Sequence, residues 1–553
     1  SPSTVALKAA LGVAATTCSY ADCLEADLIV FIGSNVANNQ PVAMKYLYYA
    51  KKRGTRVAVL NAYREPGMDR YWVPSNLESA LFGTRIADRF FLVRIGGDIA
   101  FLSGVTKQLI ERDQLDHAFI ERHTSGFAEL AAQLRAESWA DLERGSGCSR
   151  EEMAELAEML GRSQKAIFVW SMGITQHEFG EENVRAIINL ALTKGFVGRE
   201  GCGLMPIRGH SGVQGGAEMG AYATALPGGL PVNAENAKRF SKLWGFEVPA
   251  ERGRTAPEMI DAAFRGDLDL LFSVGGNFLE VLADPERVRA ALSRVPLRVH
   301  MDIVLSTQMM VDPSDAVVLL PAATRYETAG GVTETTTERR VIFSPEIPGP
   351  RIPEARPEWE VFIDLAKRVR PDLSDRLHFE STAAIRDEIA RAVPVYEGIQ
   401  RLHKVGDQFQ YGGRHLCAGW SFPMQDGRAQ FAAIRLPRRD IPSDAFLMAT
   451  RRGKQFNSMV QEDGDALTGA GRDSIFISAS DAKQLGLRTG QPVLLRGARG
   501  QMRGRAFISE IKPGNLEAHW PEAASLLDRD CRSPIAGMPD YNAVVRLEKI
   551  DDR

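Results

Sequence analysis

A glycine-rich stretch around one arginine carries the strongest chemical signal in this sequence. Glycines crowd residues 173–220, and Arg208 is the single permanent cation between Gly201 and Gly220. Because glycine is costly in ordinary helices and strands, this density predicts backbone that lies tightly against something large. The planar guanidinium of Arg208 can hold both oxygens of a small carboxylate. From the residues alone, a structural ion pair with Glu218 is an equally good role for it.

A second polar turn follows the apolar strand expected at residues 166–170. It reads Ser171-Met-Gly-Ile-Thr-Gln-His177. Because no other potential ligand stands at metal-site spacing from it, the lone His177 is interpreted as a buried structural histidine.

Strand–loop–helix units are needed to position these turns. An apolar strand over residues 27–32, a polar loop over 33–41, a helix over 42–53 and a strand over 56–60 predict a βαβ unit. Continuous apolar strands that alternate with helices are typical of a parallel sheet covered on both faces. Ligands bind beyond the carboxyl ends of such strands, so the loop and the helix that begins at Pro41 suit a phosphate.

The same pattern recurs along the chain. Further strands are expected at 166–170, 268–274, 297–301 and 316–320, and helices at 181–194, 285–292 and 358–369. One ligand with two nucleotides and a pseudo-twofold pair of domains both remain open as explanations. From residue 445 the sequence pattern changes to short predicted strands separated by glycines, which is typical of a β-barrel. These strands are expected at 446–450, 474–477, 492–496 and 503–508.

Composition narrows the class of protein. The 553 residues should form several domains, and 44% apolar with 25% charged residues is ordinary for a globular chain. A net charge of −3 without a basic cluster argues against a nucleic-acid partner. No apolar run approaches the ~20 residues that cross a bilayer. Six scattered cysteines argue against a disulfide framework, and we therefore expect a reducing, cytoplasmic location.

Taken together, these motifs resemble the alpha subunits of formate dehydrogenases, in the bis-molybdopterin guanine dinucleotide oxidoreductase family. The resemblance covers most of residues 1–370 and 445–550. It implies molybdenum or tungsten held by two pterin guanine dinucleotides, and oxidation of a small anion, formate first, at that metal. Electrons would then leave through a pterin to another redox centre, in an electron-transfer subunit or redox protein. The protein would supply position and electrostatics for the cofactor.

The implied fold is α/β, with several nucleotide-binding-type parallel-sheet units and a C-terminal β-barrel of double-psi type. We expect a first dinucleotide-binding domain over 1–165 and a second α/β domain with pterin- and substrate-facing loops over 166–370. A connecting segment over 371–440 and a cofactor-binding barrel over 441–553 complete the expected organisation.

The resemblance also implies roles for particular residues. Arg208 would bind the substrate, with His210 beside it, although His210 and Ser211 depart from the Gln-Asn of formate dehydrogenases and indicate a diverged substrate. Where the family has Asp-Pro-Arg, this chain has Asn61 and later Arg64, so Arg64 is expected to meet a diphosphate. The full set of expected cofactor-binding residues is Gly33, Asn35, Asn38, Arg64, Asp98, Met172, Gly173, Gln176, Gly276, Asn277, Asp302, Arg451, Arg452, Gln455 and Asn457.

A motif like Ser1-Pro-Ser follows the metal-ligating Cys or selenocysteine of formate dehydrogenases almost directly. We therefore expect the chain to begin just past its own metal ligand, with no metal ligand inside it. A [4Fe-4S] cluster would likewise be bound only by residues upstream, and Cys18, Cys23 and Cys202 would ligate no metal. The alternative from another class is a non-catalytic pterin-fold scaffold or binding subunit.

Overall fold

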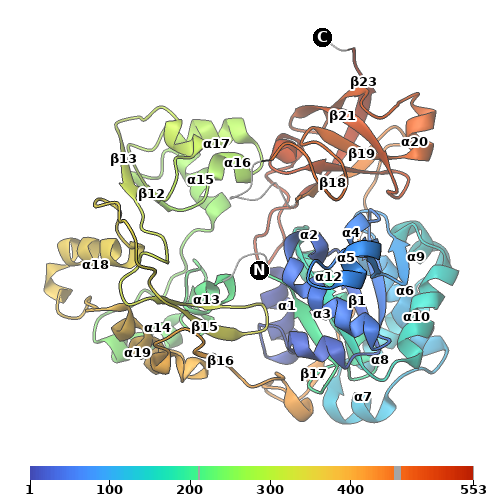
Figure 1. The fold of residues 1–553 in the computed structure, drawn as a ribbon, viewed down its shortest axis with the longest axis horizontal. Coiled ribbons are helices and arrows are strands. Elements are labelled where there is room, and N and C mark those ends of the chain that lie inside the picture. Colours follow the sequence, from blue (N-terminus) through green and yellow to red (C-terminus); the bar gives the residue numbers. More distant parts are fainter. Residues whose placement is uncertain (209–211, 454–461, 552–553) are drawn as a thin grey trace. The chain divides into compact units, whose positions relative to one another are not determined.

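The computed structural model describes residues 1–208, 212–453 and 462–551. By its contacts the chain divides into two compact units, which can be followed by colour in Figure 1. The first unit combines Ser1–Gly209 with Arg414–Arg553, and the second is His210–Gly413. The fold is mixed α/β with parallel sheets and a C-terminal closed barrel, which confirms the expected fold class.

A parallel sheet forms the centre of the first unit. In the described part of the chain its order is β5-β2-β1-β7-β8, with every neighbouring pair parallel. The strands are β1 (Leu28–Ile32), β2 (Arg56–Asn61), β5 (Arg89–Leu92), β7 (Ala166–Trp170) and β8 (Gly203–Pro206). The expected domain boundary at residue 165 falls between strands of this one sheet. The four-domain division itself stays a prediction.

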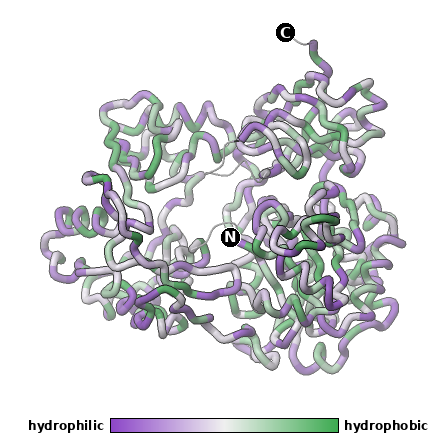
Figure 2. The backbone as a smooth tube through the Cα atoms, in the orientation of Figure 1, coloured by the Kyte–Doolittle hydropathy of each residue, from purple (hydrophilic) through white to green (hydrophobic). Residues whose placement is uncertain are grey.

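Both faces of the sheet are covered, which explains the unbroken apolar strands. In β1, Leu28, Val30 and Ile32 pack with helices of one apolar cluster, and Ile29 and Phe31 with those of another. The helices on the first side are α1 (Pro2–Leu11), α6 (Asp98–Glu111), α10 (Arg150–Arg162) and α12 (Gly180–Leu192), and α3 (Pro41–Lys52) lies on the other. Figure 2 shows hydrophobic segments gathered inside the units and hydrophilic ones along outer helices and loops.

Peripheral elements complete the α/β part of the first unit. Helices are α4 (Pro66–Asp69), α5 (Leu77–Phe82), α7 (His117–His123), α8 (Phe127–Ala136) and α9 (Trp139–Ser146). Short strand pairs are β3 (Arg70–Tyr71) with β4 (Thr84–Arg85), and β6 (Thr124–Ser125) with β17 (Ala429–Gln430).

Three local expectations differ from the structure. The loop expected over 33–41 contains a one-turn helix, α2 (Val36–Asn39), because the Asn35 side chain accepts a hydrogen bond from the Asn38 backbone N–H. The turn after β7 likewise continues into α11 (Met172–Thr175). Helix α12 ends at Leu192 and not at Lys194, whose ammonium donates to carbonyls at the end of α10.

The barrel closes from strands that are not consecutive in the chain. Its order within the described residues is β18-β22-β19-β21-β20-β23, with parallel and antiparallel pairs interleaved. The strands are β18 (Phe446–Arg451), β19 (Ser474–Ser478), β20 (Pro492–Arg496), β21 (Gln501–Ser509), β22 (Asn515–His519) and β23 (Asn542–Lys549). Helix α20 (Ala479–Gln484) connects β19 to β20. Closure removes the free strand edges that invite aggregation.

The second unit contains its own parallel sheet and a smaller antiparallel one. The parallel strands are β11 (Leu270–Val274), β12 (Leu297–Asp302) and β13 (Ala316–Pro321), which confirms the strands expected at 268–274, 297–301 and 316–320. The antiparallel strands are β14 (Val332–Thr335), β15 (Arg340–Ser344) and β16 (Gln408–Gln410), and β9 (Ala225–Leu226) pairs with β10 (Leu230–Pro231). Helices are α13 (Val213–Glu218), α14 (Ala234–Trp244), α15 (Ala256–Arg265), α16 (Phe278–Val281), α17 (Pro285–Leu292), α18 (Glu358–Val369) and α19 (Thr382–Ala392).

Two predictions from the sequence concern membrane-spanning segments and metal-binding cysteines. None of the helices in the described part has both the length and the apolar character that crossing a bilayer takes. Cys18, Cys23 and Cys202 are buried in the first unit. Their exclusion from metal binding stays a prediction.

Candidate functional site

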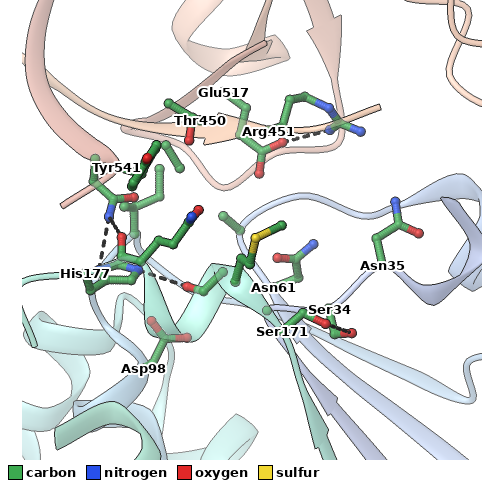
Figure 3. Close-up of a pocket in the computed structure, with 18 of the residues that line it drawn as sticks. Ser34, Asn35, Asn61, Asp98, Ser171, His177, Thr450, Arg451, Glu517 and Tyr541 are labelled. Carbon is green, nitrogen blue, oxygen red and sulfur yellow. Dashed lines mark hydrogen bonds and ion pairs between the residues drawn. The ribbon is translucent and has the colours of Figure 1, made fainter. Parts of the chain in front are cut away.

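The site lies at the carboxyl edge of the first unit's sheet. After β1 the chain moves outward through β2 and β5, and it then returns to the other side of β1 through β7 and β8. This reversal is the switch point at which open α/β sheets bind ligands. A pocket lies there, lined by the segments that follow β1, β2, β5 and β7 and by residues of the barrel (Figure 3).

The turns after β1 and β7 touch through their glycines. A methyl group added to Gly173 would come within 2.6 Å of the Gly33 carbonyl oxygen, and one added to Gly33 within 2.9 Å of the Gly173 carbonyl carbon. A hydrogen bond of 2.7 Å between the Ser34 and Ser171 hydroxyls joins the same two turns. Glycine is therefore required here by close backbone packing, as the sequence predicts.

The barrel is hydrogen-bonded to the segments that follow three of the strands. The Asn515 side chain accepts from the Ile95 N–H and donates to the Val93 carbonyl after β5. After β2, the Lys512 N–H donates to the Ala62 carbonyl, and the Tyr541 N–H donates to the Gln176 carbonyl after β7. These bonds fix the mouth of the pocket from two segments that are far apart in the chain.

One end of the pocket is positively charged. The Arg452 guanidinium lies over the Trp520 ring at 4.3 Å and donates to the Gln176 side-chain oxygen at 2.8 Å. Burial lowers the pKa of Arg452, and no carboxylate pairs with it among the described residues. A cation held in this way is stabilised when an anion joins it.

The opposite wall is acidic. Arg451 donates to Glu517 at 2.8 Å and to Glu65 at 3.2 Å, and all three side chains are buried. Figure 3 shows the Arg451–Glu517 pair on the barrel side of the pocket. Burial raises the pKa of both carboxyl groups.

His177 is a satisfied buried histidine, as interpreted from the sequence. The Asn542 amide donates to Nδ1 at 3.1 Å, so Nε2 carries the proton and donates to the Gly173 carbonyl at 2.9 Å. The neutral ring thus fixes the glycine turn from behind. Asp98 lies nearby, at the start of α6, and burial raises its pKa.

Many of the predicted cofactor residues converge in this pocket. Those that line it are Gly33, Asn35, Asp98, Met172, Gly173, Gln176, Arg451 and Arg452. They come together because each follows, or lies at, the end of a strand at one edge of the first unit.

Other predicted residues lie elsewhere. Asn38 is buried beside the pocket, and Asn39 lines the wall instead. Arg64 is not brought to the pocket, because its guanidinium pairs with Asp69 at 3.0 Å and Glu510 at 3.4 Å. Arg208 follows β8, outside the pocket lining, and its carbonyl accepts a hydrogen bond from Gln40. His210, Gln455 and Asn457 lie outside the described residues.

The second unit brings its own predicted residues together. Gly276 and Asn277 follow β11, and Asp302 ends the neighbouring β12. Gln308 holds this turn by donating to the Gly276 carbonyl at 2.9 Å, and Asn277 donates to Thr307 at 2.9 Å. Glu218, the alternative ion-pair partner for Arg208, accepts hydrogen bonds from Tyr396 and, at 2.6 Å, from Tyr411.

Sequence reasoning missed Glu65, Glu517, Tyr541 and Asn542 as pocket residues. One signal was present: Glu517 is a charged residue inside the strand Asn515–His519, where every position is buried. Glu65 follows Arg64 directly and gives no comparable signal.

Comparisons with known proteins bear on this arrangement. Residues 7–368 match the molybdopterin oxidoreductase family, and residues 446–545 match the molydopterin dinucleotide binding domain. The chain is 31% identical to the protein YdeP of Escherichia coli strain K12, over 99% of this chain and 75% of that protein. It is 28% identical to the F420-dependent formate dehydrogenase 2 subunit alpha of Methanococcus maripaludis, over 99% and 80%. Acetylene hydratase from Pelobacter acetylenicus shares the fold, with a TM-score of 0.70, 16% identity, and coverage of 99% and 81%.

Proposed function

The chain belongs to the molybdopterin oxidoreductase family, and on that premise we propose that it is the catalytic part of a molybdenum- or tungsten-dependent oxidoreductase of formate dehydrogenase type. It would bind a bis-pterin guanine dinucleotide and oxidise a small anion, with formate as the first candidate. The observation that carries the proposal is the pocket at the switch point of the first unit, with Arg452 at one end.

The residues present fit a dinucleotide. A buried cation without a carboxylate partner among the described residues, Arg452, suits a diphosphate. Because Gly33 and Gly173 have no side chains, a ligand can approach the backbone N–H groups at this edge of the sheet. The amide of Asn35 and the carboxyl group of Asp98 line the same pocket and can bind nucleotide hydroxyl or amino groups.

The proposed role of each pocket side chain follows from its contacts within this chain. Arg452 and Gln176 orient the anionic part of the ligand, and His177 keeps the Gly173 turn in place through its hydrogen bond. The hydrogen bonds from the barrel hold the exits of β2, β5 and β7 in place. When bound, the metal–pterin group supplies the two-electron redox chemistry.

The second unit would hold a second nucleotide. Its turn after β11, with Gly276 and Asn277, and Asp302 at the end of β12 repeat the arrangement that follows strands of the first unit. Two such sites in one chain support a ligand with two nucleotides.

Arg208 is proposed to orient the substrate anion. The charge of Arg208 acts on the backbone nitrogen of Ser1, so the guanidinium lies near the start of α1. By resemblance to formate dehydrogenases, the metal ligand directly precedes a motif like Ser1-Pro-Ser. A planar fork beside that position can hold both oxygens of formate.

Analysis of the purified protein tests the proposal. We expect molybdenum or tungsten, pterin, and two guanine nucleotides per metal after acid hydrolysis. Metallated protein without pterin or guanine nucleotide would overturn it. A chain that retains the fold and binds neither metal nor pterin would support the scaffold alternative. The electron acceptor is proposed to be a separate redox subunit or protein, which a pull-down of the metallated enzyme would identify.

A further inference from the structure

Two carboxyl groups share one guanidinium at the acidic wall of the pocket. Arg451 contacts Glu517 at 2.8 Å and Glu65 at 3.2 Å, and each of the three residues is 6% exposed. With both carboxyl groups ionised, the trio carries one uncompensated negative charge. An uncompensated charge in a buried position is costly.

The neighbouring elements do not balance this charge within the described residues. The Tyr63 and Phe476 rings cover the guanidinium at 5.1 and 4.4 Å and are neutral. Asp465, before β19, is 2% exposed and adds negative charge. Asn35 is uncharged. Burial and the Arg451 charge lower the pKa of His519 to about 3, so this side chain is neutral as well. The charge of Arg472 is paired with Glu522 at 2.7 Å.

The pKa values agree with the geometry. Burial raises the pKa of Glu517 to about 7 and also raises that of Glu65, while Arg451 opposes both shifts. Because the two groups share one cation, the pair holds its last proton jointly. Near neutral pH the proton is therefore only partly bound, and a nearby charge can shift the balance.

We infer that the Glu65–Glu517 pair takes up one proton from solvent when an anionic dinucleotide occupies the pocket. Phosphate charge in the same pocket makes a second carboxylate more costly, and protonation leaves the trio neutral. Only an O–H bond forms in this step. The inference rests on the proposed function, because it takes the ligand to be a nucleotide. The two glutamates are positioning residues: their protonation state sets how strongly the charges of Arg451 and Arg452 attract the ligand.

The sign of the pH dependence follows. The protonated pair binds an anion more tightly, so affinity falls as pH rises through the midpoint of the pair. For one proton the limiting slope is about tenfold per pH unit.

Calorimetry of the cofactor-free 553-residue chain with GDP as the probe tests this. Titrations at pH 7.5 in two buffers of different ionisation enthalpy should report uptake approaching one proton per GDP. Glu517→Gln should abolish the uptake and make affinity independent of pH between 7 and 8. Glu65→Gln should do the same and serves if the first variant fails to fold. Glu548→Gln, an exposed carboxylate of the same barrel paired with Arg496 at 2.9 Å, should keep the wild-type uptake.

Binding of GDP without proton uptake, or uptake that survives in both glutamine variants, would overturn the inference and leave the proposed function standing. Failure of wild type and variants to bind GDP would count against both. Infrared titration of the holoenzyme further separates the inference from the proposed function. A buried protonated carboxyl band at pH 7.5 should be present in wild type and lost in Glu517→Gln. Its absence from a holoenzyme that releases guanine nucleotide overturns the inference alone.

Discussion

The two units place the same kind of glycine turn after a parallel strand, but for different physical reasons. In the first unit, Gly33 and Gly173 lie so close that a methyl group on either would meet the backbone of the other at 2.6 to 2.9 Å. In the second unit, no described atom lies within 4 Å of a methyl group added at Gly275 or Gly276. Those glycines have φ of +64° and +77°, and only the backbone conformation favours glycine. Gly33 also has a positive φ, of +54°. The first unit therefore adds a packing requirement to its glycine turns, whereas in the second unit the backbone conformation alone favours glycine.

Gly173→Ala should have the largest effect. The added methyl group would overlap the Gly33 carbonyl oxygen, and a backbone neighbour cannot move aside as a flexible side chain can. We expect a loss of about 1–3 kcal/mol in unfolding free energy and of most bound guanine nucleotide. Chemical denaturation and nucleotide release measure the two effects. Wild-type nucleotide content in this variant would show that nucleotide binding does not depend on the contact between the two glycines.

Arg208→Lys separates substrate binding from cofactor binding within the first unit. The charge is kept and the planar fork is lost, which costs about 1.5–3 kcal/mol of bidentate contact, or roughly ten- to a hundredfold in kcat/KM. Kinetics on the metallated enzyme with formate and other small oxidisable anions measure this. Pterin content should stay at the wild-type level. Unchanged kcat/KM, or loss of pterin, would make Arg208 structural.

Arg452→Gln tests the positive end of the pocket. Removing the cation that donates to Gln176 should weaken GDP binding about tenfold, close to 1.4 kcal/mol. Thermal stability should hold or rise slightly, because a desolvated charge is removed. Arg496→Gln, at an exposed position at the end of β20 in the same barrel, is the matched control. Equal GDP affinity in Arg452→Gln and wild type would refute the phosphate role.

Glu517→Gln should change how stability depends on pH in the ligand-free chain. The folded-state pKa of Glu517, about 7, lies above its ordinary value of 4.5. The folded state therefore binds more protons than the unfolded state between these values, and wild-type stability falls as pH rises through that window. The variant should be more stable than wild type at pH 8 by up to about 3 kcal/mol and no more stable at pH 4. Parallel wild-type and variant melting curves from pH 4 to 8 would contradict this.

Gly276→Ala should have the smallest effect. The side chain has open space, and the positive φ costs about 1 kcal/mol. Guanine nucleotide content should stay near wild type, in contrast to Gly173→Ala. If both alanine variants lost nucleotide equally, the distinction between the two turns would disappear.

Sequence periodicity predicted the elements that are apolar for their whole length. The run Leu28–Ile32 and the barrel strands β18, β19, β20 and β21 lie within a residue or two of their expected ends. The barrel strands β22 and β23 were not predicted. Periodicity could not show that β7 pairs with β1, since strand neighbours in a sheet are set by contacts distant in the chain. The short helix α2 also escaped, because a single turn capped by Asn35 has no periodicity.

The pocket was predictable where residues follow strands and unpredictable where they face it from a loop. Gly33, Asp98 and Gln176 were found because carboxyl strand ends share one edge. Between the neighbours Arg64 and Glu65, charge alone favoured the arginine as a phosphate ligand. The structure turns Arg64 toward Asp69 and buries Glu65 against Arg451, a choice that depends on the barrel more than 380 residues away.

The discontinuity of the first unit has a consequence for biosynthesis. The pocket contains Gly33 and Asn542, and the sheet, the barrel and the pocket mouth are complete only when both have emerged from the ribosome. At about 5–20 residues per second, the interval between them is roughly half a minute to two minutes. The second unit, made of one continuous stretch, is synthesised within that interval and can fold while the first waits. During translation, apolar faces of the early sheet are exposed longest, and ligand capture becomes the last event of assembly.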